Sequence, residues 1–429
     1  MGQIFSGPNE SEISEKVLQE RESESEFSEK VSKTFAVAAI DIGTTFSGYA
    51  FSFKHDFLKD PTRVLTKHWK STSGEIQSNK TPTCILFNQN NEFHSFGYEA
   101  EDAYADKLLE NANDASRWSF FRSFKMTLYD QADLHEGFLL ESTNGNTLPA
   151  LTVFAESIRY MKDVMLEHCM EKTIGITMED IAWVVTVPAI WSDPAKKFMR
   201  LAAENAGIQT DRLSLALEPE AAALYVRHIP FERPNERILR NQRSVSHTVD
   251  NQNAFQNNML VKVGPGERYM VVDAGGGTVD IAVHETKNDG KLREVYMANG
   301  GDWGGTKVDE GFQNFLADLM SPRTNSCDKG IVELEGGKKV LKAFEENYID
   351  EDLEVKRHFE QKKRGIKESM TSKLTVRISP ELHEAFAQIY PGENLKELDL
   401  NRFDGNVKWV HDKLQINNPS SMLFFQRTY

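Results

Sequence analysis

The 429-residue sequence lacks the features that mark several classes of protein. Its cysteines are few and scattered, so we expect neither a disulfide framework nor a zinc site; they are Cys84, Cys169 and Cys327. No stretch approaches the roughly 18 consecutive apolar residues that cross a bilayer. The N-terminus has no basic segment followed by an apolar one, as a secretory signal would have. These absences predict a cytoplasmic protein without a transmembrane segment.

Basic residues are outnumbered by acidic ones. The chain has 50 Lys and Arg against 65 Asp and Glu, which gives a formal net charge of −15. A nucleic-acid-binding protein needs a basic face to neutralise phosphates, so we expect no nucleic-acid partner. Apolar residues make up 39% of the chain, enough for a real core. At about 150 residues per domain, the length corresponds to about three domain-sized units.

Three segments have compositions typical of solvated chain. Residues 1–34 are dominated by Ser and Glu, and we predict a disordered acidic arm. Within it, Gly2 and Ser6 fit the N-myristoylation pattern, which makes Gly2 a candidate for membrane contact, although the neighbouring glutamates would repel anionic lipid. Residues 229–268 are polar and are predicted to be a surface insertion, and residues 415–429 form an irregular tail.

Two similar segments lie more than 200 residues apart. Residues 35–53 read FAVAAIDIGTTFSGYAFSF, and residues 269–285 read YMVVDAGGGTVDIAVHE. Each is an apolar strand that ends in Asp, followed by a Gly/Thr turn and a second apolar strand. The continuous apolar run of the first predicts a strand buried on both faces, paired with the next strand as a hairpin. The repeated plan predicts two duplicated halves that each offer one turn to a shared cleft.

The two turns have the chemistry of a phosphate site. A strand that ends in Asp places a carboxylate where it can hold Mg²⁺, usually through water. Glycine lets the backbone approach a polyphosphate closely, and threonine hydroxyls add donors without charge. The chain has no Walker A motif, and Gly-Gly-Gly-Thr is followed by a strand rather than by the helix of a dinucleotide-binding fold. The alternative is that each turn is only a tight hairpin.

The rest of the chain is predicted to be mostly helical. Helical patterns dominate from about residue 100 to residue 228, where IAWVVTVPAIW at 181–191 interrupts them as a buried strand that ends at Pro188. Residues 306–370 are also predicted to be helical and are rich in charge.

These motifs, in this order, resemble the heat shock 70 kDa protein family, and within it the divergent 12A/12B-like branch. The family's first phosphate loop is similar to AIDIGTTFSGYAF, and its second is similar to VVDAGGGTVDIAV. The approach to its first connecting helix resembles WVVTVPAIWSDPAKKFMRLAAENAGI followed by LALEPEAAALY. Two further similarities are ANGGDWGGTKVDEGF, a glycine-rich turn, and FEQKKRGIK, a helix over the adenine. The resemblance covers about residues 35–410.

The resemblance implies an α/β protein with the actin-like ATPase fold, built from duplicated ribonuclease H-like lobes. Lobe I would span residues 35–228, and a partial lobe II with a helical subdomain would span residues 269–414. The family also implies that ATP or ADP binds with Mg²⁺ between the lobes.

The resemblance also assigns roles by position. Asp41 and Asp273 would hold Mg²⁺ through water. Lys125 would be the catalytic lysine, and Glu218, Asp280 and Thr278 would orient the attacking water or the metal shell. The remaining positions would contact phosphate, ribose or base: Gly43, Thr44, Thr45, Gly275, Gly276, Gly277, Gly304, Gly305, Glu360, Lys363 and Arg364.

Each role has a simpler competitor. The sequence is also consistent with Lys125 as an ordinary surface lysine and with Glu218, which stands before a proline, as a helix cap. In the same way, Asp280 is consistent with a polar position at a strand edge, and Lys363 and Arg364 are consistent with a solvated helix face.

Three further positions are compared with the family pattern; two belong to its interdomain switch and one lies near the adenine. Pro188 and Lys196 align with the interdomain switch proline and its arginine partner, but a lysine lacks the bidentate fork of arginine. Lys367 stands where the family carries a serine near the adenine.

The second lobe is expected to be incomplete. The family needs a third glycine-rich turn, but the glycines after Arg364 open no such turn; they are Gly365, Gly392 and Gly405. We therefore expect a truncated product or partial gene model, an exposed sheet edge with an uncovered apolar face, and weak or absent ATP hydrolysis. Two other functions stay open. One is a non-catalytic interaction protein that retains the first lobe, and the other is a sugar kinase of the same broad fold, for which no acidic base is located.

Overall fold

The computed structural model describes residues 34–71, 77–110, 112–129, 131, 134–228, 264–289, 291–321, 334–366, 373–417 and 424. The expectations for the N-terminal arm with Gly2, for most of the polar insertion and the C-terminal tail, and for Cys327 and Lys367 lie outside these residues. No helix in these ranges has the length and apolarity needed to cross a membrane.

The first Asp-Gly turn joins β1 (Ala36–Asp41) to β2 (Phe46–Phe53), and the predicted hairpin is confirmed. These strands belong to a five-stranded sheet with the order β12-β11-β1-β2-β5. β1 pairs in parallel with β11 (Ile181–Val187), which pairs in parallel with β12 (Leu213–Leu217). The predicted end of β11 at Pro188 is also correct. The carboxyl ends of these parallel strands therefore meet at the edge that carries the turn.

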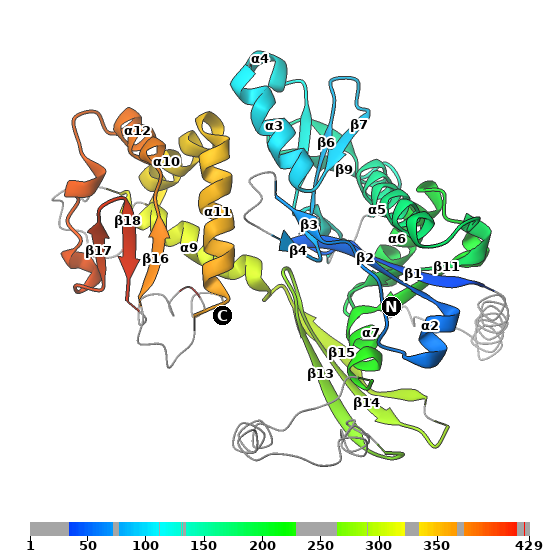
Figure 1. Cartoon of the computed structure of the whole chain (residues 1–429). Helices are drawn as coiled ribbons and strands as arrows, with labels where there is room; N and C mark the ends of the chain where they lie inside the picture. Colours follow the sequence, from blue (N-terminus) through cyan, green and yellow to red (C-terminus); the bar gives the residue numbers. More distant parts are fainter. Residues whose placement is uncertain are drawn as a thin grey trace, which may run out of the picture.

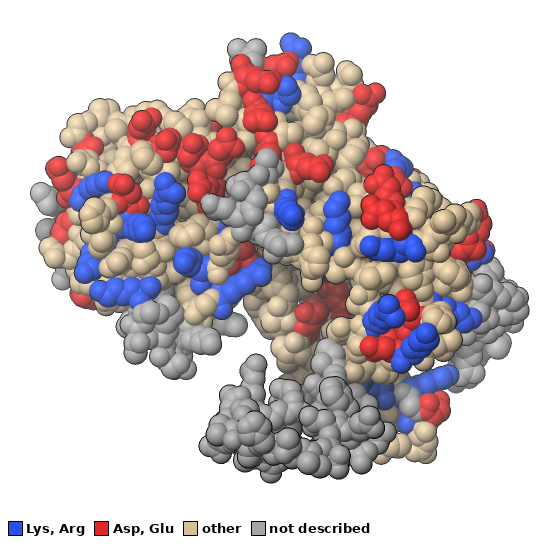
Figure 2. All heavy atoms as spheres, viewed as in Figure 1, with Lys and Arg blue, Asp and Glu red and all other residues tan. Residues whose placement is uncertain are grey.

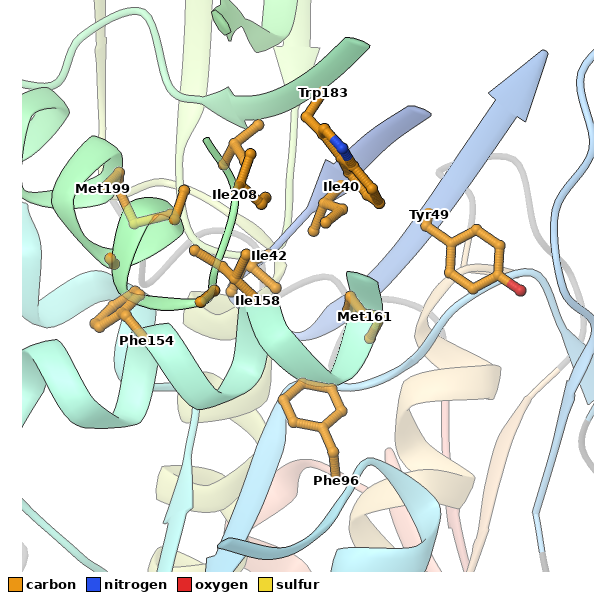
Figure 3. Close-up of a cluster of buried hydrophobic side chains, with 14 of the residues drawn as sticks. Ile40, Ile42, Tyr49, Phe96, Phe154, Ile158, Met161, Trp183, Met199 and Ile208 are labelled. Atoms are coloured by element: carbon orange, nitrogen blue, oxygen red, sulfur yellow. The ribbon is translucent and has the colours of Figure 1, made fainter. Parts of the chain in front are cut away.

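Two long helices, α5 (Ala150–Lys172) and α6 (Asp193–Asn205), pack on this sheet (Figure 1). The core between them is shown in Figure 3, where side chains from β1, β11, α5 and α6 converge. Ile40, Phe154, Ile158 and Trp183 are buried almost completely. Each such side chain contributes about 1.5–3 kcal/mol by leaving water.

The prediction that β1 is buried on both faces is wrong. Alternate side chains such as Ala38 and Ile40 are fully buried, but Val37 on the other face is 38% exposed. A continuous apolar run does not reveal whether a second layer covers the outer face, and at this end of β1 it does not.

The second Asp-Gly turn joins β13 (Arg268–Ala274) to β14 (Val279–Thr286), and β15 (Leu292–Gly301) completes an antiparallel three-stranded sheet. Figure 1 shows this sheet projecting beside α7 (Glu218–Val226), which packs on β13 and β14. The strand order leaves β13 at one edge. Among the described residues, Met270 and Val272 of β13 and Tyr296 and Met297 of β15 are more than half exposed. The expected edge and uncovered apolar face are therefore present in this sheet.

The predicted helices of residues 306–370 are confirmed as α9 (Gly305–Leu319), α10 (Leu334–Asn347) and α11 (Ile349–Lys363). They share a second core with α12 (Pro380–Ile389) and with a small sheet of order β16-β18-β17. This sheet was not predicted. Its strands have four residues each, too short to give a clear alternating pattern: β16 (Leu374–Arg377), β17 (Val407–Val410) and β18 (Lys413–Ile416).

A further three-stranded sheet, of order β7-β6-β8, lies under α3 and faces the helical part. Ile349 and Leu353 of α11 pack against Leu86, Tyr104 and Phe120 of this layer. Of the segment from about 100 to 228, the described part also contains short strands between its helices. The other elements are α2 (Lys54–Lys59), α3 (Tyr98–Glu110), α4 (Ala112–Ala115), β3 (Trp69–Lys70), β4 (Gln77–Ser78), β5 (Thr81–Pro82), β6 (Cys84–Phe87), β7 (Phe93–Phe96), β8 (Ser119–Arg122), β9 (Leu139–Glu141), β10 (Thr147–Pro149), and the 3-10 helices η1 (Phe124–Leu128), η2 (Met178–Asp180), η3 (Thr210–Arg212), η5 (Leu395–Glu397) and η6 (Asn401–Phe403).

The charged side chains are mixed on the face shown in Figure 2. On the helical part, at the left of the view, acidic groups lie mainly toward the upper edge and basic groups mainly toward the lower edge, and on the part built on the first sheet the two signs are interspersed.

Candidate functional site

The two Asp-Gly turns touch each other. A Cβ atom added to Gly276 would lie 2.3 Å from the hydroxyl oxygen of Thr45, and one added to Gly277 would lie 2.3 Å from that of Thr44. Real Cβ atoms do not approach oxygen so closely, so only glycine permits this contact. The fold thus brings together two turns that lie more than 200 residues apart in the sequence.

The second turn is held by the start of α9. The backbone amide of Gly305 donates to the carbonyl oxygen of Gly275 at 3.0 Å, and that of Gly304 donates to Gly277 at 3.0 Å. A Cβ atom on Gly304 would lie 2.5 Å from the carbonyl oxygen of Gly276. Five of the six glycines that were predicted to lie near the phosphates or the ribose, all except Gly43, therefore form one backbone assembly.

The first turn is held by Thr83, which follows β5. Its hydroxyl donates to the carbonyl oxygen of Gly43 at 2.7 Å, and its backbone amide donates to that of Thr45 at 2.9 Å. A Cβ atom on Gly43 would lie 2.2 Å from the carbonyl oxygen of Phe46, so the turn requires glycine at this position as well.

Lys125 lies inside the protein and not on its surface. It is 3% exposed, and its Nζ donates to Glu218 Oε1 at 2.7 Å. The same ammonium lies 5.5 Å from the ring centre of Trp191. The surface-lysine alternative is therefore wrong. Glu218 is an acidic residue in the first turn of α7, as the helix-cap alternative expected, and its carboxylate also pairs with Lys125.

Asp280 is 1% exposed on the central strand β14, which rules out an edge position. Its carboxylate accepts hydrogen bonds from the hydroxyl of Thr278 at 2.8 Å and from the backbone amide of Ile190 at 3.1 Å. Ile190 follows Pro188 at the end of β11. Asp280 therefore connects the second turn to the segment between β11 and α6, whose first turn contains Lys196.

Asp41 stands close enough to Asp273 to affect the pKa of that carboxyl. Burial alone would raise the pKa of Asp41, but the ammonium groups of Lys80 and Lys125 outweigh it and lower that pKa. Burial raises the pKa of Asp273, and the negative charges of Asp280 and Asp41 raise it further. Burial likewise raises the pKa of Glu218, although Lys125 opposes this shift. The site is thus a cluster of carboxylates with too few cations of its own.

The residues expected around the nucleoside form an ion-pair network on α11. Lys363 Nζ lies 2.8 Å from each carboxylate oxygen of Asp309, 3.1 Å from the carbonyl oxygen of Gly305, and also pairs with Glu360. Its side chain is mostly buried, so the solvated-face alternative fails for Lys363. Arg364 is largely exposed, as that alternative expected, and it pairs with Glu360.

Three residues of the site were not found from the sequence. They are Lys80, which pairs with Asp41; Asp309, which pairs with Lys363; and Phe46, whose ring lies 5.7 Å from the Arg364 guanidinium. Asp309 and Phe46 stand inside quoted motifs, but no spacing rule links them to α11. Lys80 lies outside every motif.

A large open cavity, of about 1310 Å³, lies between the first-sheet part and helices α9 to α11. Its lining includes Thr45, Lys80, Asp309, Glu360 and Arg364. Neither Asp41 nor Asp273 lines it, so Thr45 and Lys80 are where the cavity meets the carboxylate cluster. Its volume exceeds the roughly 300–1,000 Å³ of ordinary ligand pockets, so it has room for a nucleoside.

Comparisons with known proteins agree with these motifs. The chain is 38% identical over 317 residues to human heat shock 70 kDa protein 12B and 36% identical over 313 residues to human heat shock 70 kDa protein 12A. These alignments cover 66% and 65% of this chain and 45% of each relative, so the chain spans about half the length of the curated relatives it matches. The chaperone protein DnaK of Thermoplasma volcanium is 27% identical over 135 residues, which is 32% of this chain and 16% of that protein. No family model matches the chain.

Proposed function

Because this chain belongs to the heat shock 70 kDa protein family, in its 12A/12B-like branch, and has the actin-like ATPase fold of that family, we propose that it binds ATP or ADP with Mg²⁺ between its two Asp-Gly turns. The observation that carries this proposal is the contact of Thr44 and Thr45 with Gly277 and Gly276, beside the cluster of Asp41, Asp273 and Glu218.

The residues divide by chemistry along the site. Asp41 and Asp273 provide carboxylate oxygens, which suit a hard cation held through its water shell. The glycines and threonines of the turns bind the phosphates. Glu360, Lys363 and Arg364 line the nucleoside end. Bound Mg²⁺ would neutralise phosphate charge and polarise the terminal phosphoryl group.

The residues assigned to catalysis surround the turns. Buried Lys125 is a fixed positive charge for phosphate oxygens, and its partner Glu218 has a raised pKa that suits proton handling. Thr278 and Asp280 hold the second turn in place through their hydrogen bond.

The touching turns have a consequence for binding. A phosphate chain that enters between them must separate Thr44 and Thr45 from Gly277 and Gly276. Ligand binding is therefore coupled to a small opening between the first sheet and the β13–β15 sheet.

Isothermal titration with ATP and ADP, each with Mg²⁺, tests the proposal. We expect Asp41→Ala and Asp273→Ala to weaken binding by about tenfold or more, because each removes a charged oxygen donor from the metal shell. Asp106→Ala, at an exposed position of α3, is the matched control and should bind like the wild type. A folded wild-type chain that binds neither nucleotide would refute the proposal.

A non-catalytic interaction protein is the second candidate. The exposed apolar side chains of β13 and β15 favour it, because contiguous apolar surface commonly marks protein contacts. This candidate gains if a folded wild-type chain shows no nucleotide binding.

A further inference from the structure

Lys80 occupies an unexpected place in the site. It stands between β4 and β5, and its Nζ donates to Asp41 Oδ2 at 2.5 Å. The other oxygen of the same carboxylate accepts a hydrogen bond from Thr186 at 3.1 Å. Both oxygens of the aspartate expected to hold the metal shell are therefore engaged by side chains of this chain.

The surroundings of Lys80 are those of a cation at the mouth of an anionic cluster. Its side chain is 47% exposed and lines the large cavity together with Thr45 and Phe46. Burial would lower its pKa, but the carboxylates of Asp41, Glu218 and Asp273 outweigh this effect and raise it. Lys80 thus stays charged at the junction between the cavity and the phosphate turns.

The two lysines of the cluster differ in their freedom. Lys125 is buried and paired with Glu218, so its charge is fixed in one place. The Lys80 ammonium carries three donors at the end of a flexible four-carbon side chain, and its hydrogen bond to Asp41 is made through this end group alone. A lysine of this kind binds phosphate as a mobile point charge.

We propose that Lys80 is a further phosphate-binding residue, and that its ammonium is a built-in cation that makes the binding of a nucleoside di- or triphosphate by this chain less dependent on Mg²⁺. The inference rests on the proposed function, because it assigns a role within the same site. When a metal shell takes the oxygen of Asp41, the ammonium moves to a phosphate oxygen. When no metal is present, it supplies the positive charge itself.

The same pairing sets lysine and metal in competition. One oxygen of Asp41 cannot accept a full-strength hydrogen bond from the Lys80 ammonium and from the water shell of a metal at the same time. Without nucleotide, removal of the ammonium therefore strengthens divalent-metal binding. A purely structural ion pair would make nucleotide affinity insensitive to the charge at this position once folding is matched.

The test is isothermal titration of the full chain with ADP, in Mg²⁺ and in EDTA. The variants are Lys80→Gln and Lys80→Arg, with Lys70→Gln, at the exposed position of β3, as the matched control. In EDTA we expect Lys80→Gln to bind about tenfold more weakly than the wild type, and Lys80→Arg and Lys70→Gln to stay close to it. In Mg²⁺ the four proteins should differ by about threefold at most.

A second measurement uses the metal alone. Titration with Mn²⁺ in the absence of nucleotide, followed by electron paramagnetic resonance, should show tighter binding to Lys80→Gln than to the wild type. If Lys80→Gln shows the same Mg²⁺ dependence as the wild type, the role of Lys80 is refuted while nucleotide binding stands. If the folded wild type binds no ADP in either buffer, both proposals fall. If Lys80→Gln does not fold, the wild type alone provides the test, through its affinity for ADP in Mg²⁺ and in EDTA. An affinity that falls by more than about a hundredfold when Mg²⁺ is removed refutes the role of Lys80, and one that falls by less than about tenfold supports it.

Discussion

At the scale of single residues, the site is governed by carboxylates that share too few cations. Asp309 shows this most clearly, because it and Glu360 compete for the one ammonium of Lys363. Burial raises the pKa of Asp309 from 3.8 to about 6, although Lys363 opposes the shift. Between these two values the folded protein retains a proton that the unfolded chain has released.

This difference predicts a pH dependence of stability. The contribution of the Asp309 carboxyl is fully present below about pH 4 and is lost as the pH rises through about 6. Asp309→Asn removes this dependence, so from pH 4 to pH 7 its stability should rise relative to the wild type, by on the order of 1 kcal/mol. Urea unfolding at several pH values measures the difference. Asp106→Asn, which is exposed, should run parallel to the wild type, and parallel curves for Asp309→Asn would contradict the prediction.

At the scale of elements, the start of α9 and the second turn act as one unit. A Cβ atom on Gly304 would lie 2.5 Å from backbone atoms of Gly276 and Gly277, and backbone cannot move aside as a flexible side chain can. Gly304→Ala should therefore lower the free energy of unfolding by about 1–3 kcal/mol and weaken nucleotide binding. Gly137→Ala is the control, because its Cβ would meet only a side chain at 3.4 Å. Thermal unfolding with and without ADP checks both effects, and equal behaviour of the two variants would contradict the prediction.

A buried ion pair joins α3 and α11 in addition to their apolar packing. Arg357 donates to Glu101 at 2.9 Å through Nε, and Glu101 is almost fully buried. Arg357→Met leaves that carboxylate without its cation, so we expect a loss of about 3 kcal/mol in stability. Adding Glu101→Gln should recover part of the loss, because the unpaired charge disappears. A double-mutant cycle by urea unfolding measures the coupling, and strictly additive effects would show that the two side chains do not depend on each other.

At the scale of the whole molecule, the sequence predicted what local pattern encodes. The two Asp-Gly hairpins, β11 and helices α9 to α11 follow from apolar periodicity and turn residues, and the structure has them. The uncovered side of Val37 and the four-residue strands β16 to β18 did not follow, because burial and short pairing depend on which layers come to lie against them. Lys80 and Asp309 were missed for a related reason. Their partners Asp41 and Lys363 lie 39 and 54 residues away in sequence, and only the folded chain joins them.

The contacts around the cavity close into a ring. The second turn is bonded to the start of α9, and α9 is tied to α11 through Asp309 and Lys363. α11 is clamped to α3 by Arg357, and the layer beneath α3 continues into Thr83, which holds the first turn. Because these contacts form a closed ring, the two turns cannot separate without changing another contact in the ring. A ligand that separates the turns therefore strains the Arg357–Glu101 pair, and the strength of that pair limits how far the two turns can open.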